Sequence, residues 1–130
     1  MIVDASAILA ILLSEPEGPQ FERKLASAIG RPLMSPFNYL EAAIRVERLE
    51  KPHIVVAFDK LIAAFDIEIT QVGAEQTRLA REAYQRFGKG RHPARLNIGD
   101  CFAYALSKAR DEPLLYKGGD FSQTDVEAAL

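Results

Sequence analysis

The sequence contains one cysteine, no tryptophan and no long apolar run. Because Cys101 has no second cysteine to pair with, an internal disulfide is excluded, and a lone thiol is typical of a reducing cytoplasm. The longest apolar runs, such as residues 7–13, are far shorter than the ~20 residues that a membrane span needs. The N-terminus also lacks the positive head of a secretion signal. We therefore expect a mature cytoplasmic protein with no membrane segment.

Length and composition are those of an ordinary folded domain. The chain has 130 residues, 48% apolar and 26% charged, which is enough for one core without disulfides or structural metal. Its net charge of −2 does not favour a nucleic-acid partner, but the distribution of charge matters more than the sum. Residues 86–95 carry four cations and no acid, namely Arg86, Lys89, Arg91 and Arg95. Charge alone therefore leaves the kind of partner open.

Short apolar segments alternate with helical patterns along the chain. We expect strands at residues 1–3, 32–34, 67–70 and 114–116, and helices at residues 7–13, 19–28, 36–49, 52–65, 74–87 and 98–110. Ser35 is a favourable helix N-cap, and Pro36 suits the first helical position after it. The alternation predicts parallel β-α units in a single α/β domain, residues 1–130, with three α/β/α layers around a mainly parallel central sheet.

Two aspartates follow predicted strands. Asp4 comes directly after Ile2 and Val3, at the end of a strand where ligands bind in open parallel sheets. Asp4 is equally suited to cap the following helix, and Ser6 can complete that cap or hydrogen-bond the Asp4 carboxylate. Asp120 follows the last strand on the same expected edge, although taken alone it is an ordinary turn residue.

Two further acids lie on predicted helices. Glu41 belongs to a helix whose apolar stripe includes Phe37 and Ile44, so we expect it on the buried side, where a carboxylate is costly unless it is paired or binds metal. An ion pair with Arg45 at i+4 is the alternative, but such pairs contribute only ~0.3–0.5 kcal/mol. Asp100 is the third helical residue after Asn97, where an acid either caps the helix or acts as a rigid metal ligand.

The four acids together indicate a site for a hard cation. In a parallel sheet their positions converge on one edge, and clustered carboxylates repel unless their pKa values rise or a divalent ion binds. No histidine or cysteine accompanies them, so the ligands are all oxygen, which favours magnesium or manganese over zinc. Such a site is suited to phosphodiester hydrolysis by metal-activated water.

Four segments resemble a known family. The start MIVDASA, the segment SPFNYLEA around Glu41, the segment LNIGDCFAYALSKA around Asp100 and the ending LLYKGGDFSQTD are similar to PIN-domain ribonucleases, most of all to the toxins of bacterial VapBC toxin–antitoxin pairs. The resemblance covers residues 1–125. Its most specific parts are GDCFAYALSKA and KGGDFSQTD, whereas the opening VDAS is a weak motif by itself.

The resemblance implies a Mg²⁺-dependent endoribonuclease and assigns roles to residues. Asp4 and Asp100 would bind Mg²⁺ directly, Glu41 would complete the acidic cluster, and Ser6 would support it. The usual upstream acidic or amide position is Gly118 here, which leaves Asp120 as the candidate fourth acid. Asn97 and the cations Arg86, Lys89, Arg91 and Arg95 are the implied RNA contacts. The resemblance further implies a homodimer, an antitoxin that blocks the site, and products with a 5′-phosphate and a 3′-hydroxyl.

Other interpretations of the same residues stay open. The basic loop can be a solvated connection instead of a track for the RNA backbone. A phosphatase of the haloacid dehalogenase kind would use Asp4 as nucleophile, but it usually carries a second aspartate where this chain has Ser6. A catalytically silent RNA-binding or scaffold domain on the same fold is the alternative that is not an enzyme; such domains typically lose one or more of these acids.

Overall fold

The framework of the computed structural model, which describes all 130 residues, is a four-stranded parallel sheet with strand order β3-β2-β1-β4. The strands are β1 (Ile2–Val3), β2 (Leu33–Met34), β3 (Glu68–Ile69) and β4 (Leu114–Leu115). Ile2 of the central strand β1 is aligned with Leu33 on one side and with Leu114 on the other. All pairs are parallel, as the alternation of strands and helices predicts.

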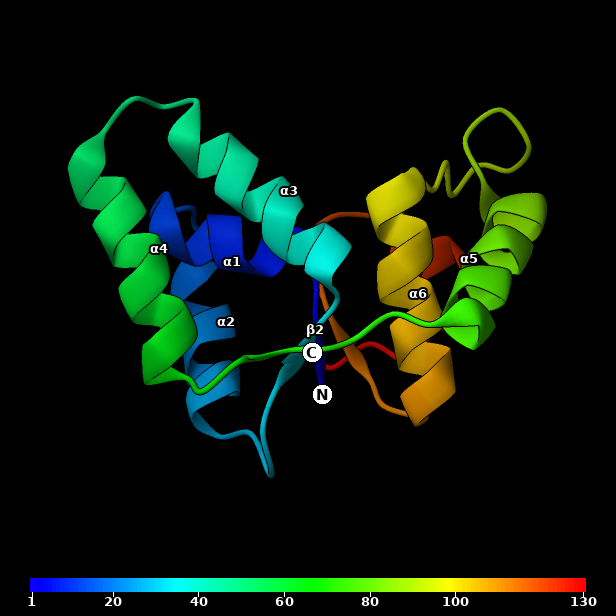
Figure 1. Ribbon diagram of the computed structural model, residues 1–130, viewed down its shortest axis with the longest axis horizontal. Helices are drawn as coiled ribbons and strands as arrows, with labels where there is room; N and C mark the ends of the chain where they lie inside the picture. Colours follow the sequence, from blue (N-terminus) through cyan, green and yellow to red (C-terminus); the bar gives the residue numbers. More distant parts are fainter.

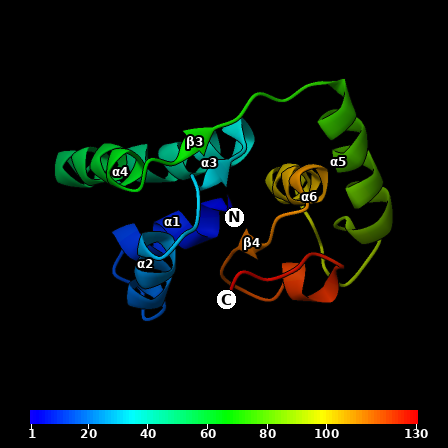
Figure 2. The same ribbon diagram turned by 90° about the horizontal axis from the view of Figure 1, so that it is seen from below.

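Six helices cover the two faces of this sheet. They are α1 (Ala5–Leu12), α2 (Gly18–Ala26), α3 (Pro36–Glu47), α4 (Pro52–Ala64), α5 (Ala74–Phe87) and α6 (Ile98–Arg110). Helices α1 to α4 lie on one side of the sheet, and α5 and α6 lie on the other (Figures 1 and 2). The three-layer α/β/α arrangement is therefore confirmed.

Strands β1, β2 and β4 each contribute one side chain to each layer of the core, because successive strand residues point to opposite faces. Ile2, Leu33 and Leu114 belong to the apolar cluster beneath α5 and α6. Their neighbours Val3, Met34 and Leu115 belong to the cluster beneath α1 to α4. Burial on both faces explains why these strands appear in the sequence as uninterrupted apolar pairs.

Helix starts follow the capping residues that the sequence predicts. The side chain of Ser35 caps α3, and Asn97 forms a reciprocal capping box with Asp100 at the start of α6. Asp4 caps α1, which therefore begins at Ala5, two residues earlier than expected. A short 3₁₀ helix, η1 (Phe121–Gln123), follows Asp120 and was not predicted. None of the helices combines the length and apolarity required to span a bilayer.

The prediction for the buried face of α3 is wrong. Its apolar residues Phe37, Leu40 and Ile44 are 40%, 56% and 43% exposed. The face that packs on the core carries Asn38, Ala42 and Val46, at a spacing of four residues. The polar Asn38 is tolerated there because its amide donates two hydrogen bonds. Glu41 is thus half-buried at the margin of the helix and not on its core-facing side.

The carboxyl end of β1 lies at a topological switch point of the sheet. The chain leaves β1 for β2 and β3 on one side, whereas β4 is added on the other. At such a point the connections that follow adjacent strands run in opposite directions and leave a crevice where ligands bind. Asp4 ends β1 at this point, and the segment after β4 carries Lys117 and Asp120.

Candidate active site

One cavity at the switch point brings together the four acids singled out in the sequence. Asp4, Glu41, Asp100 and Asp120 all line it, and its volume is about 200 Å³. They come from four segments: the end of β1, the middle of α3, the first turn of α6 and the residue before η1. Ser6 and Asn97 line the same cavity. The fold therefore brings together residues that are up to 116 positions apart.

Asp4 caps α1 and also lines the acidic cavity, which leaves its predicted role as a ligand a prediction. Its Oδ2 accepts hydrogen bonds from the backbone nitrogen of Ser6 at 3.0 Å and from Ser6 Oγ at 2.5 Å, which caps α1. Its Oδ1 accepts a 2.9 Å hydrogen bond from the amide of Asn38. Only 5% of the residue is exposed, and this burial raises the pKa of Asp4 above its usual value, although the bonds from Ser6 oppose the rise.

Asp100 is fixed by the first turn of α6. Its Oδ2 accepts from the backbone nitrogen of Asn97 at 3.0 Å, and its own backbone nitrogen donates to Asn97 Oδ1 at 2.9 Å. The residue is 9% exposed. Burial, together with the charges of Asp4, Glu41 and Asp120, raises its pKa to about 7, against the lowering effect of the Asn97 hydrogen bond. Asp100 is thus a rigidly held carboxyl that binds a proton far more strongly than usual.

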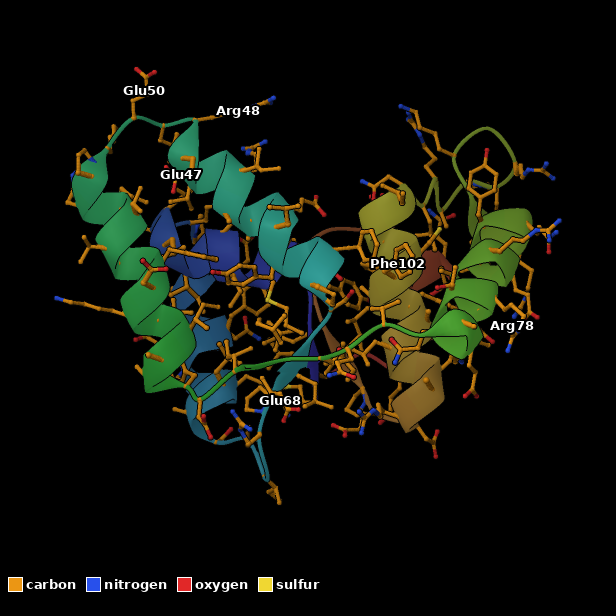
Figure 3. The ribbon with its side chains drawn as sticks, viewed as in Figure 1. Glu47, Arg48, Glu50, Glu68, Arg78 and Phe102 are labelled. Atoms are coloured by element: carbon orange, nitrogen blue, oxygen red, sulfur yellow. The ribbon has the colours of Figure 1, made fainter.

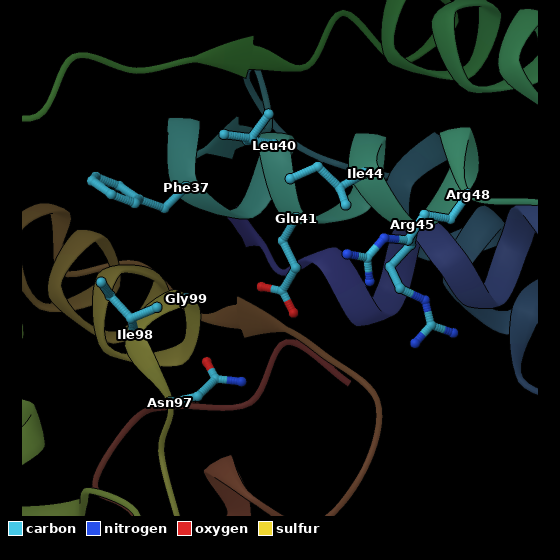
Figure 4. Close-up of a pocket in the computed structure, with 9 residues that line it drawn as sticks. All are labelled: Phe37, Leu40, Glu41, Ile44, Arg45, Arg48, Asn97, Ile98 and Gly99. Atoms are coloured by element: carbon cyan, nitrogen blue, oxygen red, sulfur yellow. The ribbon is translucent and has the colours of Figure 1, made fainter.

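Glu41 reaches the cavity from α3, which lies on the other side of the sheet from Asp100 and α6 (Figure 1). Figure 4 shows its carboxylate directed from α3 towards Asn97 and Gly99 at the start of α6. A Cβ atom at position 99 would clash with Glu41 Oε2, so only glycine leaves this carboxylate in place. Burial and the charge of Asp4 raise the pKa of Glu41, whereas Arg45 lowers it. Glu41 and Arg45 form no salt bridge within 4.0 Å, so the expected ion-pair alternative does not account for Glu41.

Asp120 differs from the other three acids because it is exposed. It lines the cavity from the residue before η1 and raises the pKa of both Asp4 and Asp100 through its charge. Gly118, two residues earlier, has a φ of +100°, a left-handed conformation that favours glycine and turns the chain after β4. Asp120 therefore adds charge at the mouth of the cavity while remaining accessible to solvent.

Two residues of this region were missed by sequence reasoning. Asn38 is fully buried, and its amide nitrogen bridges Asp4 Oδ1 and the carbonyl oxygen of Gly99, at 2.9 and 3.2 Å. It thereby joins the end of β1 to the start of α6. Lys117 contributes the only basic side chain that lines the cavity. The available sequence clue to Asn38 was its position three residues before Glu41 on the same helix.

The donors suit a hard divalent cation in their chemistry, although they do not form a ready-made coordination site. All four acids supply carboxylate oxygens, the type of ligand that Mg²⁺ and Mn²⁺ prefer. Buried Asn38 Oδ1 has no hydrogen-bond partner. As the side chains stand, however, no three acidic, histidine or cysteine residues are grouped closely enough to hold a metal ion. Mutual repulsion of the ionised carboxylates opposes a closer arrangement.

The four cations of residues 86–95 do not line the acidic cavity. Arg86 already has partners: its guanidinium donates to the Tyr104 hydroxyl at 3.1 Å and pairs with Asp125 at 3.5 Å. The guanidinium of Arg91 lies 5.4 Å from the centre of the Tyr84 ring. Lys89 and Arg95 are exposed. The segment is thus a basic surface next to the start of α6, with Arg86 fixed in a structural contact.

Comparison with known proteins gives one consistent result. The family model described as "PIN domain" matches residues 1–127. Ribonuclease VapC28 of Mycobacterium tuberculosis is 47% identical over 131 residues, which cover 100% of this chain and 98% of that protein. Ribonuclease VapC42 of the same species is 41% identical over 130 residues, 99% of this chain and 98% of the other. The crystal structure of M. tuberculosis VapC20, described as a sarcin-ricin loop cleaving toxin, shares the fold: the TM-score is 0.77 at 18% identity, over 96% and 95% of the two chains.

Proposed function

This chain belongs to the PIN-domain family, and we propose that it is a divalent-metal-dependent endoribonuclease, the toxin of a VapBC toxin–antitoxin pair. One observation carries the proposal: Asp4, Glu41, Asp100 and Asp120 line a single cavity at the switch point of the parallel sheet. The relatives that match almost the whole chain at 41–47% identity are named ribonucleases. A site of carboxylates without a Ser–His or Cys–His pair is suited to hydrolysis by water.

We propose that Asp4 and Asp100 hold the cation, with Glu41 and Asp120 supporting it. Magnesium is the expected ion, and manganese has the same ligand preference. When bound, such an ion lowers the pKa of a coordinated water and stabilises negative charge on the phosphate. The residues of the chain supply the positioning. Asn97 fixes the rotamer of Asp100, and Asn38 and Ser6 fix both oxygens of Asp4.

The raised pKa values support this assignment. Asp100, with a pKa of about 7, and Asp4, whose pKa is also raised, each favour a bound positive charge, either a proton or a metal ion. Strongly perturbed pKa values in a cleft are typical of functional sites. The basic surface of residues 89–95 then remains the predicted contact for the RNA backbone, which gives affinity without reading the sequence.

Two protein partners belong to the proposal. The VapC names of the relatives support an antitoxin partner, and we propose that it covers the acidic cavity. A homodimer is supported by an open groove of about 430 Å³, whose walls include Phe37, Leu40 and Ile44 of α3 and Ile98 of α6 (Figure 4). Ile98 is 72% exposed, and exposed apolar residues gathered in one place mark interaction surfaces.

The test is the incubation of purified protein with total RNA, with Mg²⁺ and with EDTA. We expect cleavage only with Mg²⁺, fragments with a 5′-phosphate and a 3′-hydroxyl, and loss of cleavage in Asp100→Asn. Asp59→Asn, which changes an exposed acid on α4, is the matched control and should remain active. Sequencing the fragment ends identifies the RNA. Binding of RNA without cleavage would support a silent scaffold domain and contradict the proposal.

A further inference from the structure

Lys117 is the one positive side chain in a cavity lined by four acids. Its ammonium does not pair with any of the four acids. It forms ion pairs with Glu15 and with Glu17, the latter at 3.4 Å, in the connection between α1 and α2. These two acids are distant in sequence from Lys117 and do not line the cavity. The charge of Lys117 is therefore held at the rim by groups outside the acidic cluster.

The backbone of Lys117 is linked to Asp4 through the hydroxyl of Ser6. Its nitrogen donates a 2.9 Å hydrogen bond to Ser6 Oγ, and the Ser6 hydroxyl donates to Asp4 Oδ2 at 2.5 Å. The root of the Lys117 side chain is thus fixed beside the innermost acid, whereas its end lies against Glu15 and Glu17. The four-carbon side chain of lysine is flexible, so the ammonium can change partners while the backbone stays in place.

A phosphodiester that enters this cavity meets four carboxyl groups and one ammonium. Ionised carboxylates repel the phosphate, and the basic surface of residues 89–95 does not line the cavity. An ammonium with three donors is a common ligand for phosphate oxygens. The hydrogen bond to Glu15 raises the pKa of Lys117, so its ammonium remains charged at neutral pH.

We propose that Lys117 binds the phosphate of the RNA substrate. In the free protein, Glu15 and Glu17 bind its ammonium instead and so compete with the phosphate. The inference rests on the proposed ribonuclease function and deepens it, because it assigns a phosphate ligand and a competing acidic pair to the same site. The phosphate and the two glutamates compete for one ammonium. Loss of the lysine and loss of the glutamates must therefore change RNA binding in opposite directions.

A purely structural role predicts a different pattern. If Lys117 only ties the connection between α1 and α2 to the end of β4, either change breaks the same tether. Lys117→Met and the double variant Glu15→Gln/Glu17→Gln would then affect the enzyme in the same direction. The sign of the glutamate effect thus separates the two roles.

The experiment measures kcat and KM on a short RNA that spans a site cleaved in total RNA, together with the salt dependence of binding and the melting temperature. We expect Lys117→Met to raise KM about tenfold, the effect of one charge-assisted hydrogen bond, and to reduce the salt slope by about one. Lys117→Arg should restore most of the affinity. The double glutamine variant should lower KM several-fold.

Three outcomes decide the matter. A raised KM in both Lys117→Met and the double glutamine variant, with lower melting temperatures in both, would establish a tether and overturn the proposal. Unchanged KM and salt slope in Lys117→Met, in an enzyme whose wild type cleaves the RNA, would also overturn it and leave the ribonuclease function intact. A wild-type protein that neither cleaves nor binds RNA would instead refute the proposed function, and with it this role of Lys117.

Discussion

Asn97 and Asp100 each accept a hydrogen bond from the backbone nitrogen of the other, at 2.9 and 3.0 Å. This reciprocal pair closes the first turn of α6 and holds the Asp100 carboxyl in the acidic cavity. One aspartate therefore serves as a helix cap and as a buried acid whose pKa is about 7. The two roles differ in what they require, because a cap needs an accepting oxygen, whereas the proposed metal site needs a negative charge.

Asp100→Asn separates these roles through the pH dependence of stability. In the wild type, between about pH 4 and 7, the unfolded chain releases a proton that native Asp100 retains, so the free energy of unfolding falls as pH rises. A single such group contributes a slope of up to about 1.4 kcal/mol per pH unit. Asparagine keeps the accepting oxygen and cannot ionise. We therefore expect a smaller slope and a variant more stable than the wild type at pH 8 in EDTA, measured by urea unfolding.

The same variant tests metal binding. Mg²⁺ should raise the melting temperature of the wild type, because a ligand that binds only the native state stabilises it, and this rise should be lost in Asp100→Asn. Asp59→Asn should keep both the wild-type pH slope and the Mg²⁺ effect. An Asp100→Asn protein that is less stable than the wild type at pH 8 in EDTA would show that the ionised carboxylate stabilises the native protein, which contradicts the raised pKa of Asp100.

Gly99→Ala should reduce RNA cleavage without unfolding the protein. The new Cβ would meet Glu41 Oε2, the free end of a flexible side chain, so the carboxylate moves and the backbone stays. We expect at least a tenfold loss of kcat with a melting temperature close to that of the wild type. Gly73→Ala is the control, because a Cβ there meets nothing within 4 Å. Full activity in Gly99→Ala would mean that the present position of Glu41 is not needed.

Ser6→Ala should cost both stability and activity. The hydroxyl of Ser6 accepts from the backbone of Lys117 and donates to Asp4, so its loss leaves a backbone donor without a partner. Such a loss costs about 1–3 kcal/mol. Ser27→Ala, which removes a surface hydroxyl bonded to the carbonyl of Lys24, should change stability by less than about 0.5 kcal/mol. Equal effects of the two substitutions in urea unfolding would contradict the bridging role.

Leu40→Asp tests the proposed homodimer. Leu40 lies in the open groove of α3 and is 56% exposed, so an aspartate there leaves the core intact and places a charge in any apolar interface. By light scattering after size-exclusion chromatography, we expect the wild type to be a dimer and Leu40→Asp to be a monomer. Val56→Asp on α4, a site with 50% exposure outside the groove, should remain dimeric. A dimer that persists in Leu40→Asp would place the interface elsewhere.

The basic segment offers a test in which two arginines should differ. Arg91→Ala should weaken RNA binding and reduce the salt slope by about one, with little change in melting temperature. Arg86→Ala should lower the melting temperature, because it removes one hydrogen bond to Tyr104 and one ion pair with Asp125. If Arg91→Ala leaves the affinity and the salt slope unchanged, the loop does not contact the RNA backbone.

The sheet and the acids were accessible from the sequence for a physical reason. Ile2, Val3, Leu114 and Leu115 are buried on both faces of a parallel sheet, so β1 and β4 each appear in the sequence as an apolar pair. Asp4 follows such a pair directly, and Asp100 follows the capping residue Asn97 at the expected spacing. Local patterns thus predict which residues end each element and, through topology, which of them meet.

The features that sequence patterns miss depend on contacts between distant segments. The apolar stripe of α3 looks like a core face, but the core is covered by Ala42 and Val46, and Leu40 is left exposed. Charged residues of distant segments likewise carry no local pattern that predicts their surroundings: Glu50, between α3 and α4, and Arg78, of α5, are exposed, whereas Glu68, of β3, is half-buried (Figure 3). The contact between Lys117 and Glu15, 102 positions apart, has no local pattern at all.

The position of β4 at the end of the chain sets the order of events during synthesis. Ribosomes release the N-terminus first, so β1 to β3 and helices α1 to α5 emerge before α6 and β4 exist. Asp100, Lys117 and Asp120 all belong to the final quarter of the polypeptide. A nascent chain therefore presents Asp4 and Glu41 without Asp100 and Asp120, so the acidic cavity is not yet assembled. Under the proposed ribonuclease function, cleavage of RNA can begin only after residues 98–120 have left the ribosome and folded against β1.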